Sequence, residues 1–217
     1  MKKGSGKTEK AGRRRRVRPI GSSPVAAGLA GNAVFLVGFM GAGKSSVGRA
    51  LGLGLNWTFE DLDDRIAARE RRTVAEIFRD SGESEFRRAE HAALQDVLQE
   101  LRGGGARIVA LGGGAFVQKD NVALLKASGV PTVFLDAPVE ELWLRCCRQA
   151  SETGAQRPLL RSQEQFRELY ETRRRGYAKA SRRIQTGSRR VEEIASEIAT
   201  KLGLRKIAAR SEEGEVE

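Results

Sequence analysis

Five short apolar or β-prone runs along the chain alternate with longer segments whose apolar residues recur every three or four positions. Short runs bounded by glycine, proline or charged residues predict strands, whereas the longer spacing predicts helices that pack against them. The predicted strands cover residues 34–37, 57–60, 108–111, 131–135 and 183–186. Alternating strands and helices indicate a parallel sheet covered on both faces. We therefore predict an α/β protein of three layers with a central five-stranded parallel sheet.

Capping signals mark where several of the helices begin. Thr73 and Glu76 form a capping-box pattern, and Ser162 and Gln165 repeat it. Pro138 suits the first position of a helix, because its missing N–H costs no hydrogen bond there. Two helices are predicted to begin near residues 44 and 73. Four further helices are predicted over about residues 83–101, 138–148, 162–177 and 191–202.

The net charge of +11 is concentrated at the amino-terminal end of the chain. Residues 1–32 hold nine basic residues and one acid, so the rest of the chain carries only +3. Residues 211–217 contain four glutamates and no base. Neither end has enough apolar surface to offset the entropy of ordering it. We predict a disordered basic tail over 1–32, a folded domain over 33–204 and a disordered acidic tail over 205–217.

The basic tail could in principle contact nucleic acid, since Arg13–Arg16 would attract phosphates without sequence specificity. A solvated tail explains the same residues, and we favour that interpretation.

No apolar run approaches the roughly 18 residues that a membrane span needs, and residues 24–30 make too weak a segment for a secretory signal. Cys146 and Cys147 are adjacent on a predicted helix and cannot pair with each other. Reduced thiols suit the cytosol. We therefore expect a cytoplasmic monomer with no membrane partner.

The strongest chemical signal is a glycine-rich loop between the first strand and the first helix. Gly38 is followed after four residues by Gly43-Lys44-Ser45, which is the spacing of a nucleotide phosphate-binding loop. Backbone N–H groups of such a loop face phosphate oxygens, and the helix N-terminus adds partial positive charge. Lys44 can reach the β- and γ-phosphates, and the Ser45 hydroxyl can bind Mg²⁺. The residues expected to hold the phosphates are Gly41, Ala42, Gly43, Lys44, Ser45 and Ser46.

Two carboxylates follow the second predicted strand. If the chain stays extended through Asp61 and Asp63, residues two apart project to the same side, and both can face one cleft. One carboxylate could then hold Mg²⁺ while the other meets a hydroxyl group. The alternative is that one of them caps a helix, in which case the two side chains diverge.

A glycine triplet, Gly112–Gly114, follows the third predicted strand and would let a ligand lie against bare backbone. Ligands of parallel sheets bind beyond the carboxyl ends of the strands, where this triplet falls. Arginines suited to bidentate anion binding occur at Arg87, Arg157 and Arg173, among others. Spacing alone does not choose among these arginines.

The chain resembles the shikimate kinases over about residues 33–203. The resemblance rests on several motifs in order rather than on the phosphate loop alone. These are Gly-Phe-Met-Gly-Ala-Gly-Lys-Ser-Ser (38–46), Phe-Glu-Asp-Leu-Asp (59–63), the segment 77–90, Leu-Gly-Gly-Gly-Ala (111–115), Arg-Pro-Leu-Leu (157–160), and Arg173 four residues before Tyr177.

The resemblance implies a phosphate-loop kinase fold with a mobile lid near residues 150–162, and transfer of the ATP γ-phosphoryl group to the 3-hydroxyl of shikimate. Lys44, Asp63 and Arg157 would be catalytic, and Ser45 with Asp61 would hold Mg²⁺. The implied shikimate contacts are Asp63, Arg87, Gly112, Gly113, Gly114 and Arg173. The implied ATP contacts beyond the loop are Arg148, Arg157 and Arg189. Phe78, Phe86 and Glu90 would shape or brace the acceptor pocket.

Two other functions stay open at this point. A related kinase could act on another small hydroxylated acid, as a gluconate-type kinase does. A non-enzymatic regulator could sense a metabolite through a kinase-like domain.

The segment between Arg148 and Arg157 is about two residues longer than in typical shikimate kinases, and Val191 stands where the family often has proline. These departures affect the lid and the adenine side more than catalysis.

Overall fold

The computed structural model describes residues 32–153 and 162–207. The described strands form one parallel sheet in the order β2-β3-β1-β4-β5. Their bounds are β1 Ala33–Val37, β2 Thr58–Asp61, β3 Arg107–Ala110, β4 Thr132–Asp136 and β5 Arg182–Gln185. Each predicted strand is confirmed to within one residue at either end. Every residue of the central strand β1 is buried, as its uninterrupted apolar run requires.

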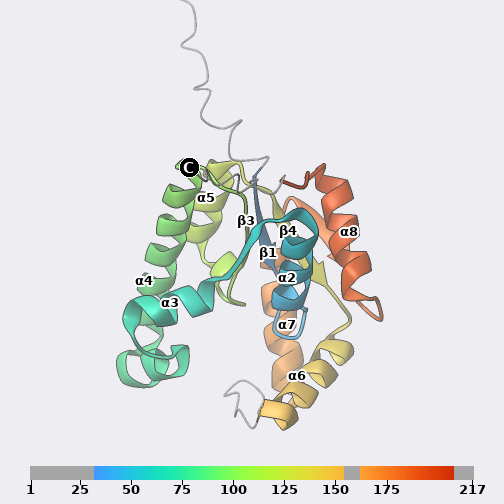
Figure 1. The fold of residues 1–217 in the computed structure, drawn as a ribbon. Helices are drawn as coiled ribbons and strands as arrows, with labels where there is room; N and C mark the ends of the chain where they lie inside the picture. Colours follow the sequence, from blue (N-terminus) through green and yellow to red (C-terminus); the bar gives the residue numbers. More distant parts are fainter. Residues whose placement is uncertain (1–31, 154–161, 208–217) are drawn as a thin grey trace, which may run out of the picture.

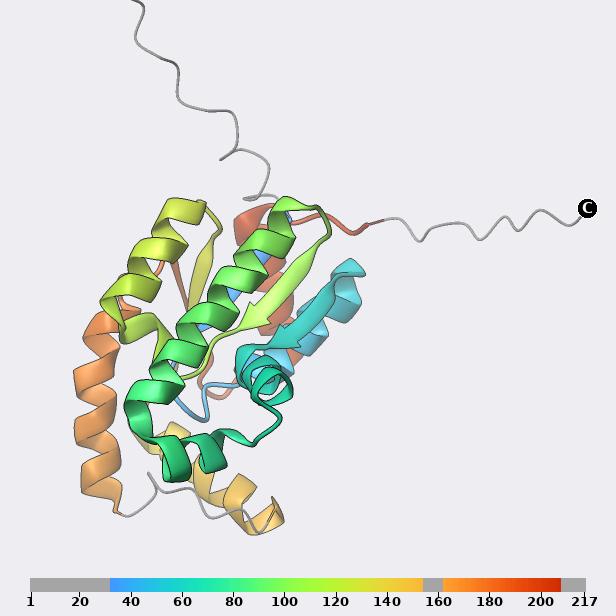
Figure 2. The ribbon, with the colours of Figure 1, turned by 90° about the vertical axis from the view of Figure 1, so that its left-hand side faces the viewer.

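Helices cover both faces of the sheet, as predicted. Their bounds are α2 Lys44–Leu55, α3 Leu62–Glu70, α4 Val74–Arg102, α5 Lys119–Ser128, α6 Val139–Thr153, α7 Gln163–Tyr177 and α8 Val191–Leu202, with a short 3₁₀ turn at Ala115–Val117. Helices α2 and α8 lie together on one face, and α4 and α5 lie on the other (Figures 1 and 2). The three-layer α/β fold is therefore confirmed. The pattern did not predict α3 or α5 as separate helices.

The predicted helix starts at Thr73 and Ser162 are both capped. The Thr73 hydroxyl accepts a hydrogen bond from the Glu76 N–H (3.2 Å), and the Glu76 carboxylate accepts one from the Thr73 N–H (2.7 Å). The Ser162 hydroxyl accepts from the Gln165 N–H at 3.2 Å. Each bond satisfies a backbone donor that the first helical turn leaves unpaired.

The last described residues lie against the end of α2. The Ile207 N–H donates to the Leu55 carbonyl (3.0 Å), and the Trp57 indole N–H donates to the Arg205 carbonyl (3.2 Å). Ordered chain thus extends three residues past the predicted domain boundary at 204. Residues 1–31 and 208–217, which hold most of the predicted tails, lie outside the described residues. Within the described ranges, no helix is long and apolar enough to cross a bilayer.

Helix α4 contains a kink at Gly82, which is where the sequence suggested separate helix starts near residues 73 and 83. Gly82 has φ 78° and ψ 175°, a conformation that side-chain-bearing residues rarely adopt. A Cβ atom there would have nothing within 4 Å. The requirement for glycine is therefore a backbone requirement and not a packing one.

Replacing Gly82 with alanine is expected to lower the free energy of unfolding by about 1–3 kcal/mol, because the new side chain strains the backbone. Gly54→Ala is the matched control. A Cβ at Gly54 also has nothing within 4 Å, but the residue lies in α2 with an ordinary φ, so alanine should leave stability unchanged or raise it by up to about 1 kcal/mol. Urea unfolding followed by circular dichroism measures both. Equal effects of the two substitutions would contradict the backbone explanation.

Candidate active site

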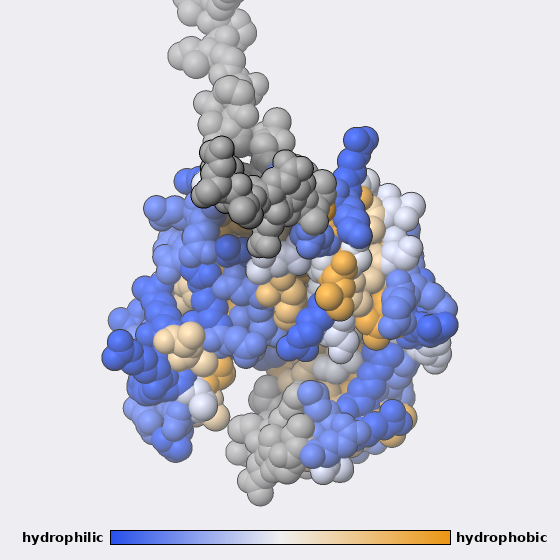
Figure 3. All heavy atoms as spheres, viewed as in Figure 1, coloured by the Kyte–Doolittle hydropathy of each residue, from blue (hydrophilic) through white to orange (hydrophobic). Residues whose placement is uncertain are grey.

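A pocket of about 780 Å³ opens at the carboxyl ends of the strands. The phosphate loop and the start of α2 form its floor, and the end of β2, helix α4, the glycine triplet, helices α6 and α7 and the β5–α8 connection form its walls. The surface is visibly hollowed below the middle of the molecule in Figure 3. This is the edge of the sheet where the sequence placed the ligand.

The phosphate loop has the predicted strand–loop–helix geometry. Gly41 and Gly43 adopt φ of 77° and 87°, which curl the backbone ahead of α2. A Cβ at Gly41 would lie 2.7 Å from the Leu142 carbonyl oxygen of α6, so this position also has no room for a side chain. The Lys44 ammonium donates to the carbonyls of Gly38 (3.0 Å) and Phe39 (3.2 Å), which folds the side chain over the loop.

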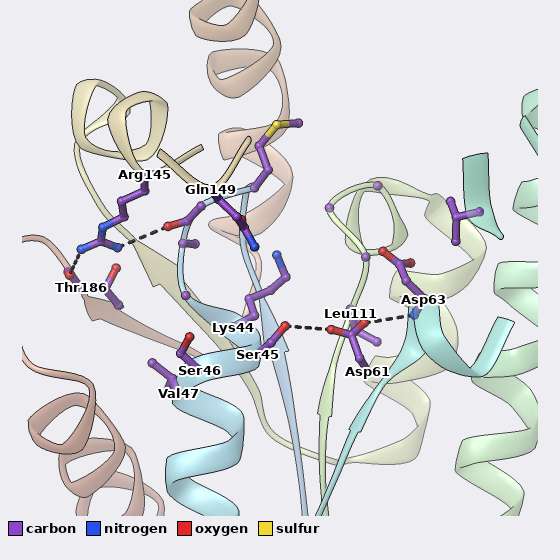
Figure 4. A pocket seen from close by; sticks show the side chains of 18 of the residues that line it. Lys44, Ser45, Ser46, Val47, Asp61, Asp63, Leu111, Arg145, Gln149 and Thr186 are labelled. Carbon is purple, nitrogen blue, oxygen red and sulfur yellow. Dashed lines mark hydrogen bonds between the residues drawn. The ribbon is translucent and has the colours of Figure 1, made fainter. Parts of the chain in front are cut away.

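A hydroxyl and a carboxylate meet beside the loop. The Ser45 hydroxyl donates to Asp61 Oδ2 at 2.9 Å (Figure 4). Oxygen donors of this kind are the ligands that Mg²⁺ prefers, usually together with substrate phosphates and water. Among the described residues, no group of three or more His, Cys, Asp or Glu side chains could hold a metal ion alone. The Ser45–Asp61 pair can supply two oxygen ligands of the kind that Mg²⁺ prefers.

The extended arrangement predicted for Asp61 and Asp63 is wrong. The strand ends at Asp61, which caps helix α3 by accepting the Asp63 N–H at 3.1 Å, and Asp63 lies in the first turn of that helix. The capping alternative is the one that the structure adopts. Both side chains still line the pocket, because the helix begins at its edge and its first turn faces inward.

Asp63 is the carboxylate that faces the acceptor half of the pocket. Its Oδ1 atom is buried and has no hydrogen-bond partner among the described residues. Burial and the neighbouring charge of Asp61 raise the pKa of Asp63 above that of an exposed aspartate, while Lys44 opposes the shift. A carboxylate with a raised pKa and a vacant acceptor atom is suited to receive a hydrogen bond or a proton from a ligand hydroxyl.

The glycine triplet leaves room for charged side chains that come from other elements. A Cβ at Gly112 would lie 2.6 Å from Asp63 Oδ1, and a Cβ at Gly114 would lie 2.6 Å from Arg87 Nη2. A Cβ at Gly113 would approach Arg173 Nη1 to 3.5 Å. The predicted grouping of the triplet with these side chains is therefore observed, and steric space explains why the first and third positions are glycine.

The structure brings Arg87 and Arg173 to one end of the pocket, close to Asp63. Arg87 donates to Glu90 and Glu83, both at 2.9 Å. Arg148 and Arg189 line the opposite, phosphate-loop side. Arg157, the arginine of the predicted catalytic set, lies outside the described residues, as does most of the predicted lid.

Sequence reasoning missed Arg145, which lies one helical turn before Arg148 on α6. Its guanidinium donates to the carbonyls of Gly41 (3.3 Å) and Thr186 (2.9 Å), and so joins the phosphate loop to the end of β5 (Figure 4). The only available signal was the three-residue spacing between the two arginines, which puts them on one face of the helix.

Glu90 is fully buried beside the acceptor end of the pocket, and its Oε1 atom has no partner among the described residues. Burial raises its pKa to about 7, although Arg87 opposes the shift. The native state therefore binds more protons than the unfolded state between about pH 4.5 and 7. The stability that Glu90 contributes is fully present below this window and is lost as the pH rises through about 7.

The melting temperature of the wild type should therefore fall relative to that of Glu90→Gln as the pH is raised from 5 to 8, because the amide cannot ionise. Differential scanning fluorimetry across this range measures the difference. Glu83→Gln removes the exposed partner of the same Arg87 and keeps Glu90, so it should follow the wild-type trend. Parallel curves for wild type and Glu90→Gln would contradict the raised pKa.

A phosphate loop at the carboxyl edge of a parallel sheet, with an adjacent hydroxyl–carboxylate pair and an arginine-lined second compartment, defines a phosphate-loop kinase for a small anionic acceptor. The shikimate kinase family model matches residues 40–203. The chain is 39% identical over 175 residues to a shikimate kinase of Cereibacter sphaeroides (79% of this chain, 83% of the relative), and 42% identical over 168 residues to one of Geobacter metallireducens (76% and 88%). The chain belongs to the shikimate kinase family, whose members are ATP-dependent phosphotransferases.

Solved structures agree with this assignment. The shikimate kinase of Acinetobacter baumannii, determined in complex with shikimate, superposes with a TM-score of 0.70 at 32% identity, over 83% of this chain and 98% of that one. The family and fold inferred from the ordered motifs are thereby confirmed. Neither the gluconate-type kinase nor the non-enzymatic regulator has comparable support.

Proposed function

We propose that the protein binds ATP–Mg²⁺ on the phosphate-loop side of the pocket and shikimate on the side of Arg87 and Arg173, and phosphorylates the 3-hydroxyl of shikimate. The observation that carries the proposal is the position of Asp63. Its unpartnered, buried oxygen faces the compartment that the two arginines line, next to the loop that would hold the phosphates. A hydroxyl acceptor and a phosphate donor could meet there.

On the donor side, backbone N–H groups of residues 41–46 would hold the phosphates at the N-terminus of α2. Lys44 would exchange its two carbonyl partners for phosphate oxygens. Ser45 and Asp61 would hold Mg²⁺, which would offset the negative charge of the phosphates. Arg148 and Arg189 would contact the part of the nucleotide that lies beyond the phosphates. We add Arg145 to these nucleotide contacts, because it already joins the phosphate loop to Thr186.

On the acceptor side, Arg87 and Arg173 would bind the shikimate carboxylate, because guanidinium groups match carboxylates in charge and shape. Asp63 would accept the hydrogen bond of the attacking hydroxyl and orient it for in-line attack. The triplet Gly112–Gly114 would let the ring approach the backbone. Arg157 and the surrounding lid would close over the phosphates and exclude water, which would otherwise compete as the acceptor.

We propose that the enzyme acts as a monomer. The basic tail is not needed for any of these roles, and we propose no nucleic-acid partner.

The test is an assay that couples ADP formation to NADH oxidation, with shikimate, quinate and gluconate supplied separately at equal concentration with ATP and Mg²⁺. Shikimate-dependent turnover should exceed turnover with the other acids by at least about 10²-fold, since unpaired polar groups in a mismatched acceptor are costly. A preference for gluconate, or ATP hydrolysis independent of any acid, would contradict the proposal.

A further inference from the structure

The two arginines at the acceptor end of the pocket are held by different kinds of groups. Arg87 forms ion pairs with Glu83 and Glu90. Arg173 forms no ion pair within 4.0 Å of a carboxylate in residues 32–153 and 162–207, although its charge acts on the buried Glu90. Its guanidinium contacts the Tyr177 hydroxyl and lies 5.9 Å from the ring centroid of Phe39. An aromatic face can hold a guanidinium without neutralising it, whereas a carboxylate partner cancels much of its charge.

Phe39 belongs to the phosphate loop but points away from the phosphates. Its side chain is fully buried, while its backbone carbonyl accepts a hydrogen bond from Lys44 at 3.2 Å. The ring packs edge-on against Phe166 at 5.0 Å and Tyr170 at 5.5 Å, both on α7. Together with Arg173, these contacts follow one face of α7 over two turns. One loop residue therefore contacts the nucleotide-side lysine through its backbone and the acceptor-side arginine through its ring.

The helix that carries Arg173 is also fixed on both sides of this contact. The Tyr170 hydroxyl donates to the buried Asp136 at 2.9 Å, and the Tyr177 hydroxyl donates to the Gly113 carbonyl. The backbone of α7 is thus tied to the end of β4 and to the glycine triplet. The long Arg173 side chain still has many rotamers on a fixed backbone, and its contacts with the Tyr177 hydroxyl and the Phe39 ring restrict them.

We propose that Phe39 is a positioning residue for acceptor binding: its ring directs the Arg173 guanidinium into the pocket and leaves its positive charge available for the carboxylate of the substrate. The proposal rests on the acceptor role of Arg173 given above. A residue of the phosphate loop, which would bind ATP, is thereby assigned a role in binding the acceptor. A residue that served only as core packing would affect stability without a selective effect on acceptor affinity.

A double-mutant cycle tests this directly. Shikimate and ADP affinities are measured by isothermal titration calorimetry on the full chain for the wild type, Phe39→Leu, Arg173→Ala and the double variant. Phe39→Leu should weaken shikimate binding about tenfold, as loss of a desolvated cation–π contact predicts, and leave ADP affinity within about twofold. In the Arg173→Ala background the same substitution should change shikimate affinity less than about twofold, because the ring then has no guanidinium to direct.

Phe35→Leu is the matched control, since Phe35 is equally buried in β1, the strand that leads into the same loop. It should have the same small effect on shikimate affinity with and without Arg173. Should Phe39→Leu fold poorly, Phe39→Met fills the space with a flexible apolar chain and tests the same contact.

Each outcome decides between defined alternatives. Equal losses from Phe39→Leu in both backgrounds, or a parallel loss of ADP affinity, would overturn the positioning role and leave Phe39 as a packing residue of the loop. A wild type that does not bind shikimate, or an Arg173→Ala variant with unchanged shikimate affinity, would overturn the acceptor assignment itself, and the role of Phe39 with it.

Discussion

Lys44→Ala is expected to lower kcat by at least about 10³-fold, the range found when a preorganised group that stabilises transition-state charge is removed. The Lys44 side chain extends from the first turn of α2 over the phosphate loop. In its proposed role, alanine would remove a cation that offsets charge on the transferring phosphate. Steady-state kinetics with saturating ATP and shikimate measure the loss.

The fold should survive this substitution. Lys44 donates to the Gly38 and Phe39 carbonyls at a partly exposed site, where water can replace these two bonds. A circular dichroism spectrum and melting temperature close to those of the wild type are therefore expected. Lys126→Ala, in the last turn of α5 at the far end of the molecule, should retain full activity. An active Lys44→Ala enzyme would contradict the donor-site assignment.

Asp63→Asn is expected to lower kcat by about 10²–10⁴-fold, which is the usual contribution of a positioned general base. The amide has nearly the same shape as the carboxylate but cannot take up the proton of the attacking hydroxyl. The shikimate KM should change much less than kcat, because the arginines that would bind the substrate carboxylate are retained. Initial rates over a matrix of shikimate and ATP concentrations separate the two constants.

Asp64→Asn provides the comparison, since Asp64 is the exposed neighbour of Asp63 in the same helical turn. Its kinetic constants should match those of the wild type. A change in the shikimate KM alone would make Asp63 a binding residue and not a base.

The sheet and the phosphate loop could be predicted from sequence because their signals are local. A fully buried strand requires a continuous apolar run, and Gly41 and Gly43 are required by the backbone conformation of the loop itself. The glycine triplet could also be located from its own sequence, although the side chains that occupy the space beside it come from α3, α4 and α7.

The failures involve features that depend on neighbours in space. Helix α3 has only two buried residues, Leu62 and Ile66, so its apolar periodicity is too short to distinguish it from an extended segment. Arg145 looked like any other charged residue on a helix, because its role depends on the Gly41 and Thr186 carbonyls, which are distant in sequence. Such contacts join residues that are far apart in the sequence, so they can be identified only in the folded structure.

The crowding beside the glycine triplet constrains how this acceptor site could change during evolution or design. A methyl group at Gly112 would displace the carboxylate of Asp63, and one at Gly114 would displace the guanidinium of Arg87. If Asp63 and Arg87 have the proposed roles, side chains at Gly112 or Gly114 would impair catalysis and acceptor binding together. The aromatic pair Phe78 and Phe86, with ring centroids 4.5 Å apart on α4, lines the same compartment without contributing charge. We therefore expect changes of acceptor preference to arise more readily at this pair than at Gly112 or Gly114.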